Sequence, residues 1–125
     1  MTALTPMLTV HDAAGAIDFY TAAFGAREIS RQTTPTGQIV AELDVDGNRF
    51  FVVDANPDAF NRSPRELGGT TVRLSLVVDD PDAWAARAIT TGATEVFPVE
   101  DQPYGMRQGR VEDPYGHHWL LGRDL

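Results

Sequence analysis

The sequence predicts an α+β fold in which one domain of 125 residues contains two βαβββ modules. The prediction depends on three pairs of similar segments, which occur in the same order in the two halves of the chain. One pair lies where a strand meets a helix, one where that helix ends, and one at a tight turn before a later strand. The pairs are residues 8–12 (LTVHD) with 76–80 (LVVDD), 25–29 (GAREI) with 92–96 (GATEV), and 44–47 (DVDG) with 113–116 (DPYG).

Module one is predicted to occupy residues 1–54. A strand is expected over residues 4–10, with Leu4, Leu8 and Val10 on its core side. Asp12 is suited to cap a helix that runs to Phe24 and ends at a glycine. The remaining elements are strands over residues 27–33, 38–45 and 48–54, the last two joined by an Asp46-Gly47 hairpin turn.

Residues 55–70 are predicted to form an irregular linker, because they contain Asn-Pro, Ser-Pro and Gly-Gly pairs. Module two then covers residues 71–125 and repeats the pattern of module one. Asp80 is expected to cap its helix and Gly92 to end it. The strands are expected over residues 71–78, 95–98, 106–112 and 117–121, with a Pro-Tyr-Gly turn before the last strand.

Composition excludes several classes of function. The formal net charge is −8, which disfavours nucleic acid because phosphate binding needs a basic face. The chain contains no cysteine, so disulfides, thiolate metal sites and cysteine nucleophiles are all excluded. No apolar run is long enough to span a bilayer and the first residues do not resemble a signal peptide. We therefore expect a cytoplasmic protein without a membrane partner.

The order of elements, with Asp-Pro-x-Gly before the last strand, resembles the vicinal oxygen chelate superfamily of glyoxalase I, bleomycin resistance proteins and extradiol dioxygenases. Residues 103–107 (PYGMR) and 113–119 (DPYGHHW) look most similar to its PhnB-like, glyoxalase-like members. The resemblance implies two modules whose curved mixed sheets enclose a cavity, with helices outside. It also implies a homodimer in which modules often pair across the two chains. Members of the superfamily include lyases, isomerases, oxygenases and binding proteins.

The resemblance also implies where a metal would be held, namely on the first and last strands of each module. Those positions fall on Thr5, Phe51, Arg73 and Leu120. None is a good ligand, since a divalent ion needs several converging His, Glu, Asp or Gln donors. His117 and His118 are adjacent on a strand and should point to opposite faces, so they do not replace the missing donors. We expect no metal and no other cofactor.

Strand alternation and the resemblance together predict an apolar cavity with a few polar groups. An inward Arg73 would bind a ligand carboxylate or phosphate. Alternatively, it would form a structural ion pair with Glu42, Glu112 or another acid, or its side chain would extend to solvent at the dimer interface. Tyr104 is a candidate for the rim of the cavity, as are Met106, Gln108 and Arg110. The predicted cavity residues are Thr5, Met7, Phe51, Val53, Arg73, Ser75, His118, Leu120 and Tyr104.

The leading hypothesis is a metal-free binding protein for an aromatic or amphipathic small molecule, and the acidic net charge would suit a cationic one. The second hypothesis is a lyase or isomerase with a non-standard site, for example one that uses His118 with Glu42 or Glu112. A third is a dimeric scaffold whose cavity is vestigial. The sequence leaves open whether the protein is an enzyme.

Overall fold

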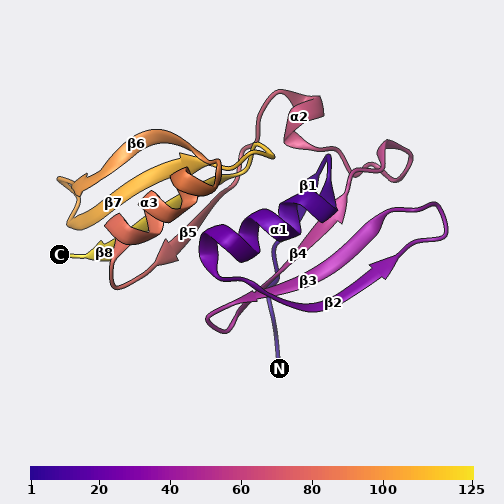
Figure 1. The fold of residues 1–125 in the computed structure, drawn as a ribbon, viewed down its shortest axis with the longest axis horizontal. Coiled ribbons are helices and arrows are strands. Elements are labelled where there is room, and N and C mark those ends of the chain that lie inside the picture. Colours follow the sequence, from indigo (N-terminus) through magenta and orange to yellow (C-terminus); the bar gives the residue numbers. More distant parts are fainter.

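The structure, a computed structural model, describes all of residues 1–125 and contains two four-stranded sheets, each with one long helix (Figure 1). The first sheet has the order β1-β4-β3-β2, in which β1 and β4 are parallel and the other neighbours antiparallel. The elements of this half are β1 (Met7–Val10), α1 (Ala13–Phe24), β2 (Arg27–Thr33), β3 (Ile39–Val45) and β4 (Asn48–Asp54).

The second sheet repeats this topology with the order β5-β8-β7-β6. Its elements are β5 (Arg73–Val77), α3 (Pro81–Thr91), β6 (Thr94–Asp101), β7 (Met106–Glu112) and β8 (His118–Asp124). Between the halves, the segment expected to be irregular contains a short 3-10 helix, η1 (Pro57–Ala59), and one α-helical turn, α2 (Pro64–Leu67). Both begin with a proline, whose fixed φ and missing N–H suit the first position of a helix.

The predicted helix ends are confirmed by their hydrogen bonds. Asp12 accepts a hydrogen bond from the backbone N–H of Gly15 at 3.1 Å, and Asp80 accepts one from Ala83 at 3.1 Å. Gly25 ends α1 at a φ of 67°, a conformation that a side chain would strain. The duplicated sequence signals therefore correspond to duplicated local structure.

Some predicted strand boundaries are wrong. The first strand begins at Met7, not at residue 4, and Leu4 is 98% exposed instead of lying on the core side. Only the backbone carbonyl of Pro6 extends the pairing, by accepting a hydrogen bond from Phe51. Conversely, β6 and β8 are longer than expected because each continues along β7 into more polar sequence. Pairing with a neighbouring strand, which a hydropathy pattern does not report, sets these limits.

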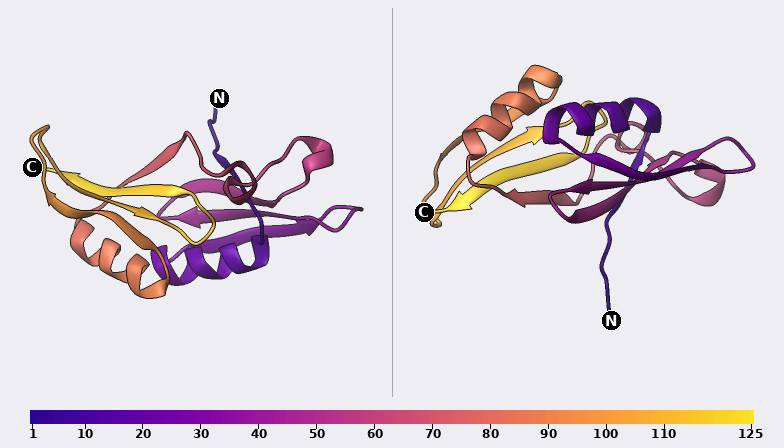
Figure 2. Two further views of the ribbon diagram at one scale, coloured as in Figure 1. Left: turned by 90° about the horizontal axis from the view of Figure 1, so that it is seen from above. Right: turned by 60° about the horizontal axis from the view of Figure 1, so that its bottom comes forward.

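The two helices pack against each other and lie on the same side of both sheets (Figure 2). Their contact buries an aromatic cluster in which Phe24 stacks on Trp84 of α3 and also meets Trp119 of β8. Tyr20 lies in the centre of this cluster and is fully buried. A single core is thus shared by the two modules, with its middle at the α1–α3 contact.

A buried carboxylate connects the modules inside this core. Asp113, 3% exposed in the turn between β7 and β8, accepts a hydrogen bond from the hydroxyl of Tyr20 on α1. The indole N–H of Trp119 donates to the same carboxylate oxygen at 2.9 Å. The other oxygen accepts the backbone N–H groups of Tyr115 at 2.8 Å and His117 at 3.1 Å. Four donors therefore surround a group that, when ionised, can only accept.

Two further contacts join module one or the linker to the same turn. The Nε2 atom of His117 lies 2.8 Å from the backbone carbonyl oxygen of Thr9 on β1. Pro64 of α2 packs on Gly116, where an added Cβ would lie only 2.7 Å from the proline Cβ. Gly116 also has a φ of 89°, so both its conformation and its surroundings require glycine. The β7–β8 turn is therefore the point at which the halves are held together.

Replacing Asp113 with Asn should destabilise the protein strongly. Each carboxylate oxygen of Asp113 accepts two hydrogen bonds, and in asparagine an N–H₂ group would replace one of these oxygens. Two buried donors would then have no acceptor, and the remaining hydrogen bonds would no longer be charge-assisted. We expect a loss of about 3 kcal/mol in the free energy of unfolding, measured by urea denaturation. The matched control is Asp58→Asn in the exposed η1 segment, with an expected change below about 0.5 kcal/mol. Equal stability of the two variants would contradict this account of the turn.

Alkaline pH should also weaken the fold through Tyr20. Burial, and next the neighbouring Asp113 carboxylate, raise the pKa of Tyr20 well above its ordinary value of 10.0. Above pH 10.0 the unfolded chain therefore loses a proton that the folded chain keeps, so stability is intact below this pH and falls as pH rises through it. In Tyr20→Phe, the free energy of unfolding should decline less steeply with rising pH, by up to about 1.4 kcal/mol per pH unit. Parallel declines in the two proteins would show that Tyr20 titrates normally.

Candidate functional site

The face of the first sheet that points away from α1 carries three of the predicted residues. Met7, Phe51 and Glu42 lie in one row across β1, β4 and β3, and Val53 lies in the next row. Met7 is 61% exposed, whereas Val53 is buried. Thr5 lies just before the beginning of the first strand. Most of the residues in these rows are apolar. The acid among them, Glu42, forms an ion pair with Arg49 at 3.4 Å.

The corresponding face of the second sheet is more polar and carries the other predicted residues. One row across β5, β8 and β7 contains Arg73, His118 and Glu112. The next row contains Ser75, Leu120 and Arg110, followed by Phe97 on β6. The residues that alternate with these along β8, Trp119 and Leu121, point to the opposite face of the sheet and are buried toward α3. The predicted facing of Arg73, Ser75, His118 and Leu120 thus matches the register.

Both ring nitrogens of His118 have partners. The Nε–H of Arg110 donates to the Nδ1 atom at 2.9 Å, and the Nε2 atom lies 3.2 Å from a carboxylate oxygen of Glu112. Because a guanidinium can only donate, Nδ1 must accept, and the ring proton is therefore on Nε2. Neither nitrogen is left free to take a proton from a substrate. The imidazole instead orients Arg110 and Glu112 on the open face of the sheet.

Arg73 has no ion-pair partner within the chain, contrary to one of the three expectations for it. Glu42 is paired with Arg49 and Glu112 with His118, so neither acid reaches Arg73. Its side chain is exposed on the open face and lines a hollow of about 490 Å³. Two expectations remain for this geometry: a guanidinium available to an anionic ligand, and a side chain that extends at a dimer interface.

Tyr104 forms part of the same hollow. Its hydroxyl donates to the Oε1 atom of Gln108 at 2.7 Å, and the Nε2 of Gln102 donates to the backbone carbonyl of Gln108 at 2.9 Å. These bonds hold the β6–β7 turn over the end of the sheet. The hollow is lined by Arg73, Phe97, Pro98, Glu100, Gln102 and Tyr104. Phe97 was not among the residues predicted from the sequence, because the strand containing it was assigned without a facing.

The two open faces do not enclose a cavity within one chain. The sheets lie side by side, with both helices beneath them, so the open faces point to the same side (Figure 2). Only Thr5 and Ser75, one from each set, line a common cleft, of about 500 Å³ between residues 3–6, the β3–β4 turn and β5. The nine predicted residues are therefore divided between the two modules and do not surround one common space within the chain.

The four positions implied for a metal do not fit one. Thr5, Phe51, Arg73 and Leu120 supply one weak oxygen donor and one cation between them. Elsewhere in the chain, no group of three or more His, Asp or Glu side chains is arranged so that it could hold a metal ion. Leu120 lies on the open face as expected, whereas Thr5 precedes the first strand instead of lying on it.

The model of the Glyoxalase/Bleomycin resistance protein/Dioxygenase superfamily matches residues 3–121. The Mycobacterium tuberculosis protein Rv0887c is 46% identical over 98% of this chain and 75% of its own length. The X-ray structure of the Arabidopsis thaliana protein At5g48480 has a TM-score of 0.77 at 30% identity and covers 96% of this chain and 97% of that one. TioX from Micromonospora sp. ML1 has a TM-score of 0.73 at 29% identity, with both chains fully covered.

The chain therefore belongs to the glyoxalase/bleomycin resistance protein/dioxygenase superfamily. Its two βαβββ modules and its α+β architecture are those of the structural relatives. None of its helices combines the length and the hydropathy needed to cross a membrane. Because this fold supports several chemistries, the activity has to be argued from the residues on the two open faces.

Proposed function

We propose that this protein binds an aromatic or amphipathic small molecule in a cavity between two copies of the chain, without a metal. The supporting observation is the composition of the open faces. Phe51, Phe97 and Leu120 provide apolar surface, and a small number of polar groups stand beside them. Binding sites for organic molecules have this composition, in which shape and apolar contact give affinity and a few polar groups give orientation.

The second copy is needed because each open face is only half of a cavity. Exposed apolar side chains remain on or beside both faces, including Met7 at 61% and Val77 at 67% exposure. The contact between α1 and α3 keeps the faces from closing on each other within the chain. We propose a homodimer in which module one of each protomer covers module two of its partner, so that the apolar face meets the more polar one.

Two alternatives are less well supported. A lyase or isomerase would need a general base, and both nitrogens of His118 are already bonded, which leaves the partly exposed Glu112 for that role. A vestigial scaffold would have a filled site, whereas the hollow beside Phe97 measures about 490 Å³.

Segments 103–107 and 113–119 favour the PhnB-like subgroup, and the cysteine-free composition suits the cytoplasm.

A thermal-shift experiment tests the binding function. A neutral aromatic dye such as phenylnaphthylamine, at saturating concentration, should raise the melting temperature by about 5 °C, and a chelator should leave it unchanged. Phe51→Ser, on the open face, should reduce the shift, whereas Phe60→Ser, 86% exposed in the linker, should not. A melting temperature that no compound raises, or that falls on chelation, would contradict the proposal.

A further inference from the structure

The chain contains ten arginines, no lysine and eighteen acids. In such a protein each guanidinium has many possible partners, and eight of the ten have one. Arg65 and Arg73 are the exceptions, with neither a hydrogen bond nor an ion pair. The partnered residues are Arg27, Arg31, Arg49, Arg62, Arg87, Arg107, Arg110 and Arg123. An unpaired guanidinium is thus the unusual state in this molecule.

Arg73 stands on the open face of the second sheet, where the proposed cavity lies. It neighbours His118 in the parallel β5–β8 register and lines the hollow with Phe97 and Tyr104. Alternation turns the adjacent Leu74 to the opposite side, where it packs on the core. The free guanidinium therefore faces the same space as two aromatic rings.

A second guanidinium lies on the same face of the sheet, beside the hollow's Phe97. Arg110 is next to Phe97 across the β6–β7 pairing and next to Leu120 across the β7–β8 pairing. Its Nε is used by His118, but neither terminal nitrogen has a partner. Because the imidazole is itself held by Glu112, Arg110 is oriented before any ligand arrives. Two guanidinium groups with free donors on one face form a typical site for an oxyanion.

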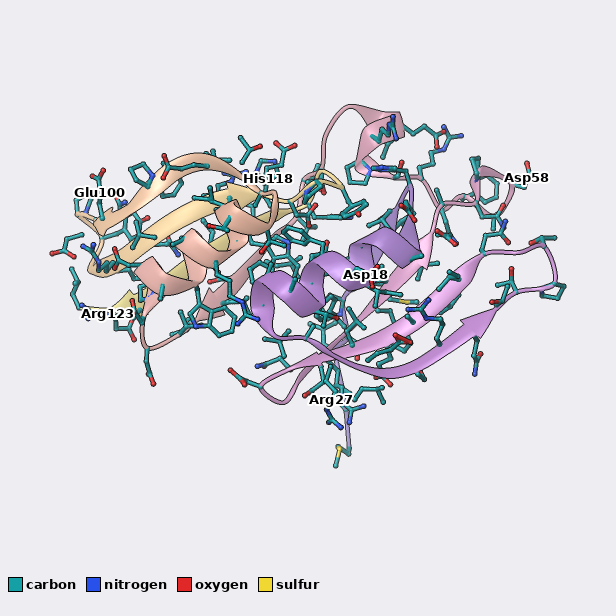
Figure 3. The ribbon with its side chains drawn as sticks, viewed as in Figure 1. Asp18, Arg27, Asp58, Glu100, His118 and Arg123 are labelled. Atoms are coloured by element: carbon teal, nitrogen blue, oxygen red, sulfur yellow. The ribbon has the colours of Figure 1, made fainter.

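Two acids share this face with the arginines: Glu112, which is paired with His118, and Glu100, at the far end of the hollow. Glu100 lines it but is not ion-paired with Arg73. Figure 3 places Glu100 at the outer end of the second sheet and His118 at the end nearest module one. Since Arg73 is the register neighbour of His118, the basic end of the face is the inner one. Unpaired acids are expected in a chain with this excess of them, so Glu100 carries less information than Arg73.

We propose that the ligand is an aromatic acid whose carboxylate, sulfonate or phosphate binds Arg73 and Arg110, while its ring packs on Phe97 and Tyr104. This inference rests on the proposed binding function and specifies the class of ligand. It disfavours the cationic compound that net charge suggested, because local groups act at contact distance whereas net charge acts weakly through screened solvent. The ring contacts supply apolar burial and the arginines orient the acid.

Two fluorescent probes separate the two contributions. Anilinonaphthalene sulfonate carries an acid group, and phenylnaphthylamine has the same ring system without it. Wild-type protein should bind the sulfonate more tightly. In Arg73→Gln the dissociation constant of the sulfonate should rise roughly tenfold, with that of phenylnaphthylamine unchanged. Arg123→Gln is the matched control, because this exposed arginine alternates with the open-face residues of β8 and bonds only a backbone carbonyl, and the variant should bind both probes as wild type does.

The outcomes distinguish this inference from the proposed function. If phenylnaphthylamine binds as well as the sulfonate, or if Arg73→Gln affects both probes equally, the anion site is wrong while the cavity remains. If neither probe binds wild-type protein, both proposals fail. Glu100→Gln removes an acid from the lining of the hollow and should make sulfonate binding slightly tighter, and weaker binding would contradict the placement of the ligand's acid group at the inner end. Because Arg73 is exposed and has no partner, its replacement should leave the melting temperature unchanged.

Discussion

The carboxylate of Asp113 is the interaction on which the arrangement of the two modules depends. It lies in a turn of module two, yet one of its four donors is Tyr20 on the helix of module one. A buried ion with unsatisfied lone pairs would be costly, and here both oxygens are fully used. The turn can therefore keep its shape only while α1 lies against it, and the position of one module fixes the position of the other.

This arrangement has a direct consequence for function. With α1 and α3 in contact beneath the sheets, the open faces lie side by side and neither can serve as the lid of the other. In the proposed homodimer, the apolar face of module one and the arginine-bearing face of module two are complementary, and a second copy of the chain would cover each of them. On this account, stability and binding are linked, because the core that joins the modules is what keeps the cavity open to a partner.

Much of the fold could be predicted from local signals, because the duplication repeats them. Asp12 and Asp80 cap helices as expected, since capping depends on only a few neighbouring residues. The role of Asp113 could not be predicted in this way. Its counterpart in the repeat, Asp44, forms partly exposed ion pairs with arginines, and only the tertiary position of Tyr20 makes the two turns different. Strand alternation located Arg73 and His118 correctly on the open face, but the bonds of Arg110 needed the cross-strand register.

The central claim is that one chain contains only half of each cavity. Sedimentation equilibrium over a dilution series, with phenylnaphthylamine followed by its absorbance, tests this claim directly. The account predicts a particle of two chains that carries the dye, and loss of bound dye as dilution produces single chains. A single chain that sediments with the dye still bound would contradict it, because the binding site would then be complete within one protomer.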